Sequence, residues 1–347
     1  SRETRGTRMT LREKAVSSQG HLTTTPVENA EYHSHPAVSA SHLKEIERSP
    51  QHYWARFVDP NRFEPTPTPA ILLGTAVHAQ ILELNRFDEI VAIAPDGIDR
   101  RTKAGKESWA AFESEAKGKV VISRNDAEIV SAMGTAVFKH PAASMLLAFS
   151  GKAETSWFWT DEKTGLECKC RPDWLLDDGS VIVDLKTTED ASPRGFQQSI
   201  ARYGYAQQAA WYLHGLEQAT GTCPTQFIFV AVEKKPPYCV GVYAADAEMI
   251  KAGWDAAERN LERIAECRAN NHWPGYGDEI QPIGLPPWMR PRADGTATFT
   301  PEQIANVLFS RPPLDKLAAS TLLPYSLEEE KDGVTFVFEI LITIYME

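Results

Sequence analysis

The sequence is poor in cysteine, and the spacing of its cysteines does not indicate a disulfide framework. Five occur in 347 residues, an odd and scattered set that predicts reduced thiols in a cytoplasmic protein. Cys168 and Cys170 form the one close pair, and a zinc or iron–sulfur site would need a second pair that the sequence lacks. We therefore expect no iron–sulfur cluster and interpret both residues as small buried strand residues.

The chain also lacks a long apolar run and an excess of positive charge. No segment reaches the ~18 apolar residues of a membrane span, so no membrane association is expected. The formal net charge of −11 argues against a protein that coats nucleic acid by bulk electrostatics. An enzyme whose basic residues line one local channel remains compatible with that charge.

The stretch CKCRPDWLLDDGSVIVDLKTT, residues 168–188, carries most of the information. Its pattern predicts a strand over residues 166–174, a turn, and a second, buried strand over residues 181–187. Asp184 and Lys186 are two apart in that strand, so their side chains share a face. Asp173 follows Pro172 where the neighbouring strand ends. The stretch therefore predicts two carboxylates and one ammonium at one point.

This trio has a chemical rationale. Two carboxylates are hard oxygen ligands suited to Mg²⁺, with Mn²⁺ as a substitute. A bound metal polarises a phosphate and activates water, and Lys186 can hold that water. The alternative interpretation is an ordinary ion pair of Asp184 and Lys186 at a strand end. The Pro-Asp dipeptide upstream favours the catalytic interpretation.

Two further residues are candidates for the same centre. His78 lies in an apolar helix predicted over residues 71–82, where the small residues 74–76 allow close backbone approach; a satisfied core histidine is the alternative. Glu154 lies in a strand predicted over residues 153–160, which would complete a three-strand meander. A metal or water contact and a solvent-facing strand end are equally compatible with Glu154.

A long helix is predicted over residues 193–220, and Gln208 and Tyr212 share one face of it. That face suits a phosphate backbone, although an aromatic stripe is also typical of a core. The order of elements predicts an α/β fold with a mixed central sheet flanked by helices. We expect a flexible leader at residues 1–29, native or not, an enzymatic domain at 30–289 and an extension of unknown role at 290–347.

These motifs together resemble the PD-(D/E)xK (restriction-endonuclease-like) nucleases. Within them, the chain is similar to the RecE-type exonuclease (exonuclease VIII) domain of phage or prophage recombination systems and to RecB-like nucleases. The resemblance covers about residues 31–287. It rests on Val38–Ser41, Ser49-Pro50, Gly74–His78, Cys168–Asp173, Asp184–Thr188 and the Gln-x-x-x-Tyr of Gln208 and Tyr212.

The resemblance implies a role for each matched residue. Asp173, Asp184 and the main-chain carbonyl of Leu185 would bind the metal, with His78 at the same centre and Glu154 as a further contact. Lys186 would position the water. The residues expected to contact the substrate are Gln208, Tyr212, Tyr205 and Arg171.

The implied activity is Mg²⁺-dependent hydrolysis of linear double-stranded DNA from 5′ ends, leaving 3′ single strands for an annealing protein. A ring tetramer is the oligomer that the resemblance implies. A structure-specific endonuclease and a non-catalytic DNA-end or partner-binding module are the alternatives. Lys169, Arg171, Arg194 and Arg202 are all candidates for a terminal phosphate, and their spacing does not choose among them.

Overall fold

The computed structural model describes residues 29–62, 66–285, 325–331 and 334–340. Contacts divide the chain into two units, residues 1–277 and 278–347. In the second unit, a hairpin pairs β10 (Tyr325–Lys331) with β11 (Val334–Ile340). The leader expected at residues 1–29 lies outside the described residues except for Asn29, where a helix begins. Among the described helices, none is long and apolar enough to cross a membrane.

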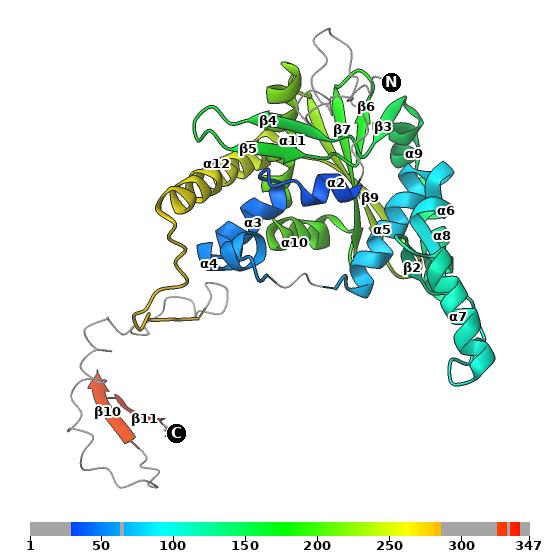
Figure 1. The fold of residues 1–347 in the computed structure, drawn as a ribbon. Helices are drawn as coiled ribbons and strands as arrows, with labels where there is room; N and C mark the ends of the chain where they lie inside the picture. Colours follow the sequence, from blue (N-terminus) through cyan, green and yellow to red (C-terminus); the bar gives the residue numbers. More distant parts are fainter. Residues whose placement is uncertain (1–28, 63–65, 286–324, 332–333, 341–347) are drawn as a thin grey trace, which may run out of the picture. The chain divides into compact units, whose positions relative to one another are not determined.

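A five-stranded mixed sheet in the order β3-β6-β7-β8-β9 forms the centre of the first unit. Its central pair, β7 and β8, is parallel, and the other neighbours are antiparallel. The predicted fold class, an α/β fold with a mixed sheet flanked by helices, is confirmed (Figure 1). The strands are β3 (Gly151–Ala153), β6 (Trp174–Leu176), β7 (Val181–Thr188), β8 (Gln226–Glu233) and β9 (Val240–Ala244).

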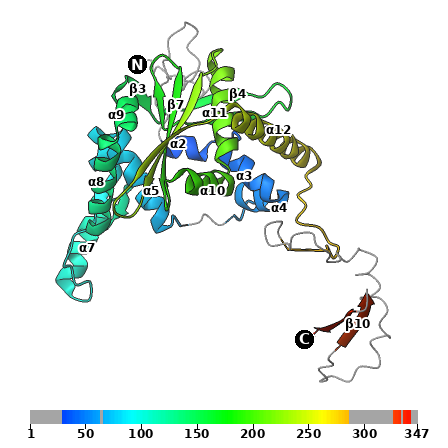
Figure 2. The same cartoon turned by 180° about the vertical axis from the view of Figure 1, so that it is seen from behind.

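Both faces of the central pair are buried because its apolar residues alternate between two hydrophobic clusters. Ile182 of β7 and Phe227 and Phe229 of β8 belong to one cluster, whereas Val183 and Leu185 belong to the other. This period of two places Asp184 on the Ile182 face. The sheet is therefore the middle layer of three, with helices on each side (Figure 2).

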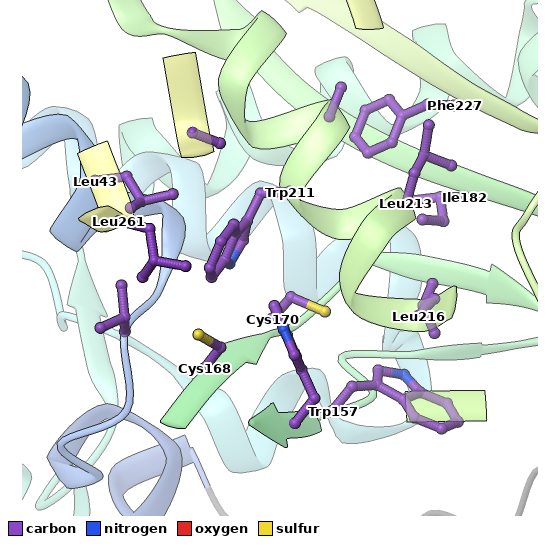
Figure 3. Packing of buried hydrophobic residues seen from close by; sticks show 14 of the residues in the cluster. Leu43, Trp157, Cys168, Cys170, Ile182, Trp211, Leu213, Leu216, Phe227 and Leu261 are labelled. Atoms are coloured by element: carbon purple, nitrogen blue, oxygen red, sulfur yellow. The ribbon is translucent and has the colours of Figure 1, made fainter. Parts of the chain in front are cut away.

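The Ile182 side is covered by helices from both ends of the unit. These are α3 (Ala40–Arg48), α4 (Pro50–Tyr53), the single turn η1 (Trp54–Val58), α10 (Pro193–Tyr203), α11 (Tyr205–Thr220) and α12 (Ala247–Asn270). A separate hairpin of β4 (Trp157–Thr160) and β5 (Glu167–Cys170) packs here too. Cys168 and Cys170 are fully buried beside Trp211, as the sequence predicts (Figure 3).

The opposite side is covered by α5 (Pro69–Leu82), α8 (Arg124–Lys139) and α9 (Pro141–Ala148). A short parallel sheet of β1 (Val91–Ile93) and β2 (Val120–Ile122) lies next to them. The remaining elements are α2 (Asn29–Ser34), η2 (Leu84–Arg86), α6 (Phe87–Ile90) and α7 (Lys103–Glu115). Helix starts follow their caps: Thr68 accepts a hydrogen bond from the N–H of Ile71, and Pro69 occupies the first helical position.

Two predicted elements are each divided in two, so these predictions were wrong. The strand expected over residues 166–174 breaks between Cys170 and Trp174, because Pro172 has no N–H to donate to a ladder. Its halves join different sheets, so the three-strand meander does not form. The helix expected over residues 193–220 breaks at Gly204, whose φ of 71° lies in the left-handed region.

Candidate active site

The β6–β7 hairpin brings the two predicted aspartates together. Trp174 of β6 pairs with Val183 of β7, so the antiparallel register places Asp173 opposite Asp184 one position further on. Asp184 is fully buried and Asp173 is 8% exposed. The Oδ2 atom of Asp173 accepts a hydrogen bond of 2.8 Å from the main-chain N–H of Leu185. The break at Pro172 therefore positions Asp173 at the edge of the sheet's central pair.

Lys186 and Gln208 contact Asp184 from two directions. The ammonium of Lys186 lies 2.5 Å from Oδ2 of Asp184, while the amide of Gln208 donates to Oδ1 at 3.1 Å. The Lys186 ammonium also lies over the ring of Tyr205, 5.0 Å from its centroid. Oδ2 makes the ion pair but no hydrogen bond of good geometry to any described residue. Each oxygen of this buried carboxylate thus faces a fixed polar partner.

His78 and Glu154 complete the centre from separate elements. Nδ1 of His78, on α5, lies 3.7 Å from Oδ2 of Asp173 and 4.0 Å from Oε1 of Glu154. One ligand atom from each of these three residues lies within 4.8 Å of the others. The main-chain N–H of Leu185 donates to Asp173, so the backbone of Leu185 adjoins the same centre.

Glu154 does not lie in a strand as predicted. β3 ends at Ala153 and β4 begins at Trp157, and Glu154 occupies the connection with φ +50°. That conformation is uncommon for a residue other than glycine. It is held by the Glu154 N–H, which donates to the carbonyl of Asp173 at 3.0 Å. A residue predicted at a strand end is instead turned toward the aspartate by a strained backbone.

The surroundings of the centre disfavour ionisation of its carboxyl groups. Burial raises the pKa of Asp173, raises that of Asp184 to about 6, and, with the charge of Asp173, raises that of Glu154 to about 8. Burial opposes the charge on Lys186, yet the carboxylates of Asp184 and Asp173 raise its pKa to about 12. The ammonium of Lys186 faces Asp184 and Asp173, while the charge of Arg171 acts on Glu154. The centre therefore favours additional positive charge.

The donor set fits a divalent cation. Clustered carboxylate oxygens suit Mg²⁺ or Mn²⁺, and an imidazole adds a nitrogen donor that manganese accepts. Burial, followed by the charge of Lys186, lowers the pKa of His78 to about 4, so its ring is neutral at pH 7 and can act as a ligand. Asp173, Glu154 and His78 are the residues that would hold the metal, with Asp184 alongside.

The residues predicted to contact the substrate lie in different surroundings. Gln208 points at Asp184, and with Tyr212 it also lines a cavity of about 450 Å³. Arg171 is 7% exposed; its guanidinium lies 4.2 Å from the Tyr32 ring centroid, and its Nε donates to Ser156. Arg171 is thus placed against the protein, and a DNA contact from it remains a prediction.

The four candidates for binding a terminal phosphate also differ in exposure: Lys169 and Arg171 are buried, whereas Arg194 and Arg202 are exposed. The Lys169 ammonium donates to the carbonyls of Tyr32 and His35, so together with Arg171 it fixes α2 to β5. Arg194 and Arg202 are exposed on α10. Sequence reasoning missed Tyr32, which lies under both buried cations at 4.5 and 4.2 Å. No motif marks it, and only its position shortly before Val38, which bridges to Cys168, hints at proximity.

The fold and the site define a class. A mixed sheet that presents Pro-Asp and, on the adjacent strand, Asp-x-Lys is the core of a PD-(D/E)xK nuclease. The chain belongs to the family described as PDDEXK-like domain of unknown function (DUF3799), whose family model matches residues 39–285. Membership supports a nuclease, and thus a hydrolase acting on DNA, of a superfamily that typically uses divalent metals.

One solved structure shows the same fold. A crystal structure from Eubacterium rectale, described as a "Putative exonuclease", superposes with a TM-score of 0.52 at 16% identity and covers 75% of this chain and 97% of its own. At that identity the likeness concerns the fold alone. The structure of SSO0001 covers 56% of this chain and 87% of its own at 13% identity, but its TM-score of 0.23 carries no argument. No curated protein matches the chain.

Proposed function

We propose that the protein is a metal-dependent exonuclease that resects linear double-stranded DNA from 5′ ends. The observation that carries the proposal is the convergence of His78, Glu154 and Asp173, within 4.8 Å of one another, beside the buried ion pair of Asp184 and Lys186. The name of the Eubacterium rectale protein is the reason to rank exonuclease above endonuclease. Polarity rests on the resemblance to RecE-type enzymes alone.

The chain's own residues divide the work of phosphodiester hydrolysis. A bound divalent cation supplies a polarised phosphate oxygen and an acidified water when present. Lys186 stays protonated at neutral pH and can orient the attacking water and stabilise charge developing on the phosphate. Gln208 holds Oδ1 of Asp184, which leaves Oδ2 directed toward Lys186. His78 and Glu154 complete the donor set from outside the strand pair.

Digestion of end-labelled linear duplex beside covalently closed circles tests the proposal. With Mg²⁺, we expect early release of label from the 5′ end, persistent label at the 3′ end and intact circles. Asp184→Asn should abolish release, and Glu162→Gln, an exposed carboxyl in the turn after β4, should not. Cleaved circles would favour the structure-specific endonuclease. DNA binding without any cleavage would favour a non-catalytic binding module.

Two wider expectations belong to the same proposal. The 3′ single strands that resection leaves are substrates for an annealing protein, which is the partner that the resemblance implies. The resemblance also implies a ring tetramer, which would thread the duplex. Light scattering on the purified protein measures the oligomer directly, and a monomer at micromolar concentration would remove the ring from the proposal.

A further inference from the structure

A cavity of about 450 Å³ adjoins the candidate active site on the Ile182 side of the sheet. Side chains from α2, α3, η1, α10 and α11 line it, and α3 and α10 lie near each other in both views (Figures 1 and 2). Gln208 forms part of its wall and donates to Oδ1 of Asp184. The cavity is therefore one side chain away from a catalytic carboxylate. Its volume falls within the range of small-molecule sites.

Rings, uncharged polar groups and three cationic side chains line the cavity, and no carboxylate of the described residues contributes to it. His42 stacks on Phe57 with centroids 3.9 Å apart and planes at 22°. It is 8% exposed, and its Nδ1 accepts from the main-chain N–H of Ser39 at 3.2 Å. The neutral ring therefore carries its proton on Nε2. That nitrogen has no hydrogen-bonding partner among the described residues, and His42 is one of the residues that line the cavity.

The cations of the lining are largely engaged elsewhere. Lys169 donates to two main-chain carbonyls, and Arg56 pairs with Glu45 at 2.7 Å. Lys44 lies 5.4 Å from the ring centroid of Tyr203 and makes no ion pair with a described residue. A site built for a phosphate alone would present a free arginine fork. Here several rings line the cavity, and Lys44 is the lining cation that has neither a carboxylate nor a main-chain carbonyl partner among the described residues.

We propose that the cavity binds the unstacked base of the terminal nucleotide of the strand being hydrolysed. The base packs against the Tyr203 ring and the His42–Phe57 pair, and Lys44 meets the adjoining phosphate. Every base has a face that stacks on an aromatic ring, so the pocket is tolerant of sequence. This proposal rests on the proposed function and deepens it: the substrate at the catalytic centre is a frayed single-stranded end, and Gln208 lies between the bound nucleotide and Asp184.

Abasic ends test the assignment. Linear duplexes are compared whose terminal nucleotides carry a base or an abasic analogue, all with terminal phosphates. We expect the wild-type protein to lose roughly 10- to 100-fold in kcat/KM on the abasic ends, as base stacking commonly contributes. Tyr203→Ala should lose a similar factor on normal ends and no longer discriminate. Tyr203 is 44% exposed, so the substitution should leave the fold intact, and Phe149→Ala, also exposed but outside the cavity, should discriminate like the wild type.

A binding measurement separates failure of the pocket from failure of the nuclease proposal. Single-stranded oligonucleotides carrying terminal or internal 2-aminopurine are added to the metal-free protein, and fluorescence is recorded. Quenching confined to the terminal analogue and lost in Tyr203→Ala supports the pocket even if no DNA is ever cleaved. Equal cleavage of normal and abasic ends, or no quenching of the terminal analogue, would overturn the assignment.

Discussion

Replacing Glu154 with glutamine should stabilise the metal-free protein at alkaline pH. Burial and the neighbouring Asp173 raise the pKa of Glu154 from 4.5 to about 8, so the folded protein retains a proton that the unfolded chain releases. The stability that this proton contributes is fully present below pH 4.5 and is lost as the pH rises through about 8. Glutamine resembles the protonated form at every pH, so Glu154→Gln removes the loss.

The expected change in stability follows from the pKa shift of Glu154, reduced for screening by solvent. A shift from 4.5 to about 8 corresponds to at most about 5 kcal/mol, at about 1.4 kcal/mol for each pH unit. The Glu154 side chain is 32% exposed, and its titration is coupled to that of Asp173. Solvent screening and this coupling reduce the part of that energy that affects stability. We expect Glu154→Gln to raise the free energy of unfolding by about 2 kcal/mol at pH 9 and by nearly nothing at pH 4.5.

Urea unfolding in EDTA at both pH values measures this difference, with Glu162→Gln as the matched exposed control. The slope with urea should be unchanged, so a shift in midpoint reports stability. Mg²⁺ should stabilise the wild-type protein at pH 9 more than Glu154→Gln, because the cation offsets the same charge. A variant no more stable than the wild type at pH 9, or one equally stabilised at both pH values, would refute the electrostatic reasoning.

Three other substitutions test separate parts of the structure. Lys186→Ala leaves the fully buried Asp184 without its ion-pair partner, so we expect destabilisation of about 3 kcal/mol in thermal melts together with loss of DNA hydrolysis; an active, equally stable variant would contradict the assignment. Gly204→Ala has open space for its Cβ, so only the left-handed backbone opposes it, and urea unfolding should show a loss of about 1 kcal/mol. Gly253→Ala would place a Cβ 2.1 Å from the carbonyl oxygen and 2.4 Å from the carbonyl carbon of Ala206, and should abolish soluble expression. Ala252→Ser, on the exposed face of α12, should not.

The centre of the site was predictable because its signals are local. Asp184 and Lys186 share a face by the period of a strand, and the apolar residues around them mark that strand as buried on both sides. The turn at residues 177–179 sets the hairpin, so the spacing to Asp173 is translated into an antiparallel register. These steps need only the sequence within about 20 residues.

The other parts depend on contacts between distant segments. Glu154 reaches the centre through a left-handed conformation held by the Asp173 carbonyl, which strand propensity does not encode. Helical spacing places Gln208 and Tyr212 on one face, but it does not reveal that the face meets Asp184. The cavity needs α3 and α10 to lie near each other, although their residues are about 150 positions apart in the chain.

The most direct test of the account is the rate of nucleotide release from linear duplex DNA by the wild-type protein and Asp184→Asn, each measured in Mg²⁺ and in EDTA. We predict release by the wild-type protein in Mg²⁺ alone, with a decrease of at least about 100-fold in the other three reactions. Release that persists in EDTA or in Asp184→Asn would contradict the assignment of the centre. Absence of release from the wild-type protein in both Mg²⁺ and Mn²⁺ would contradict the nuclease itself.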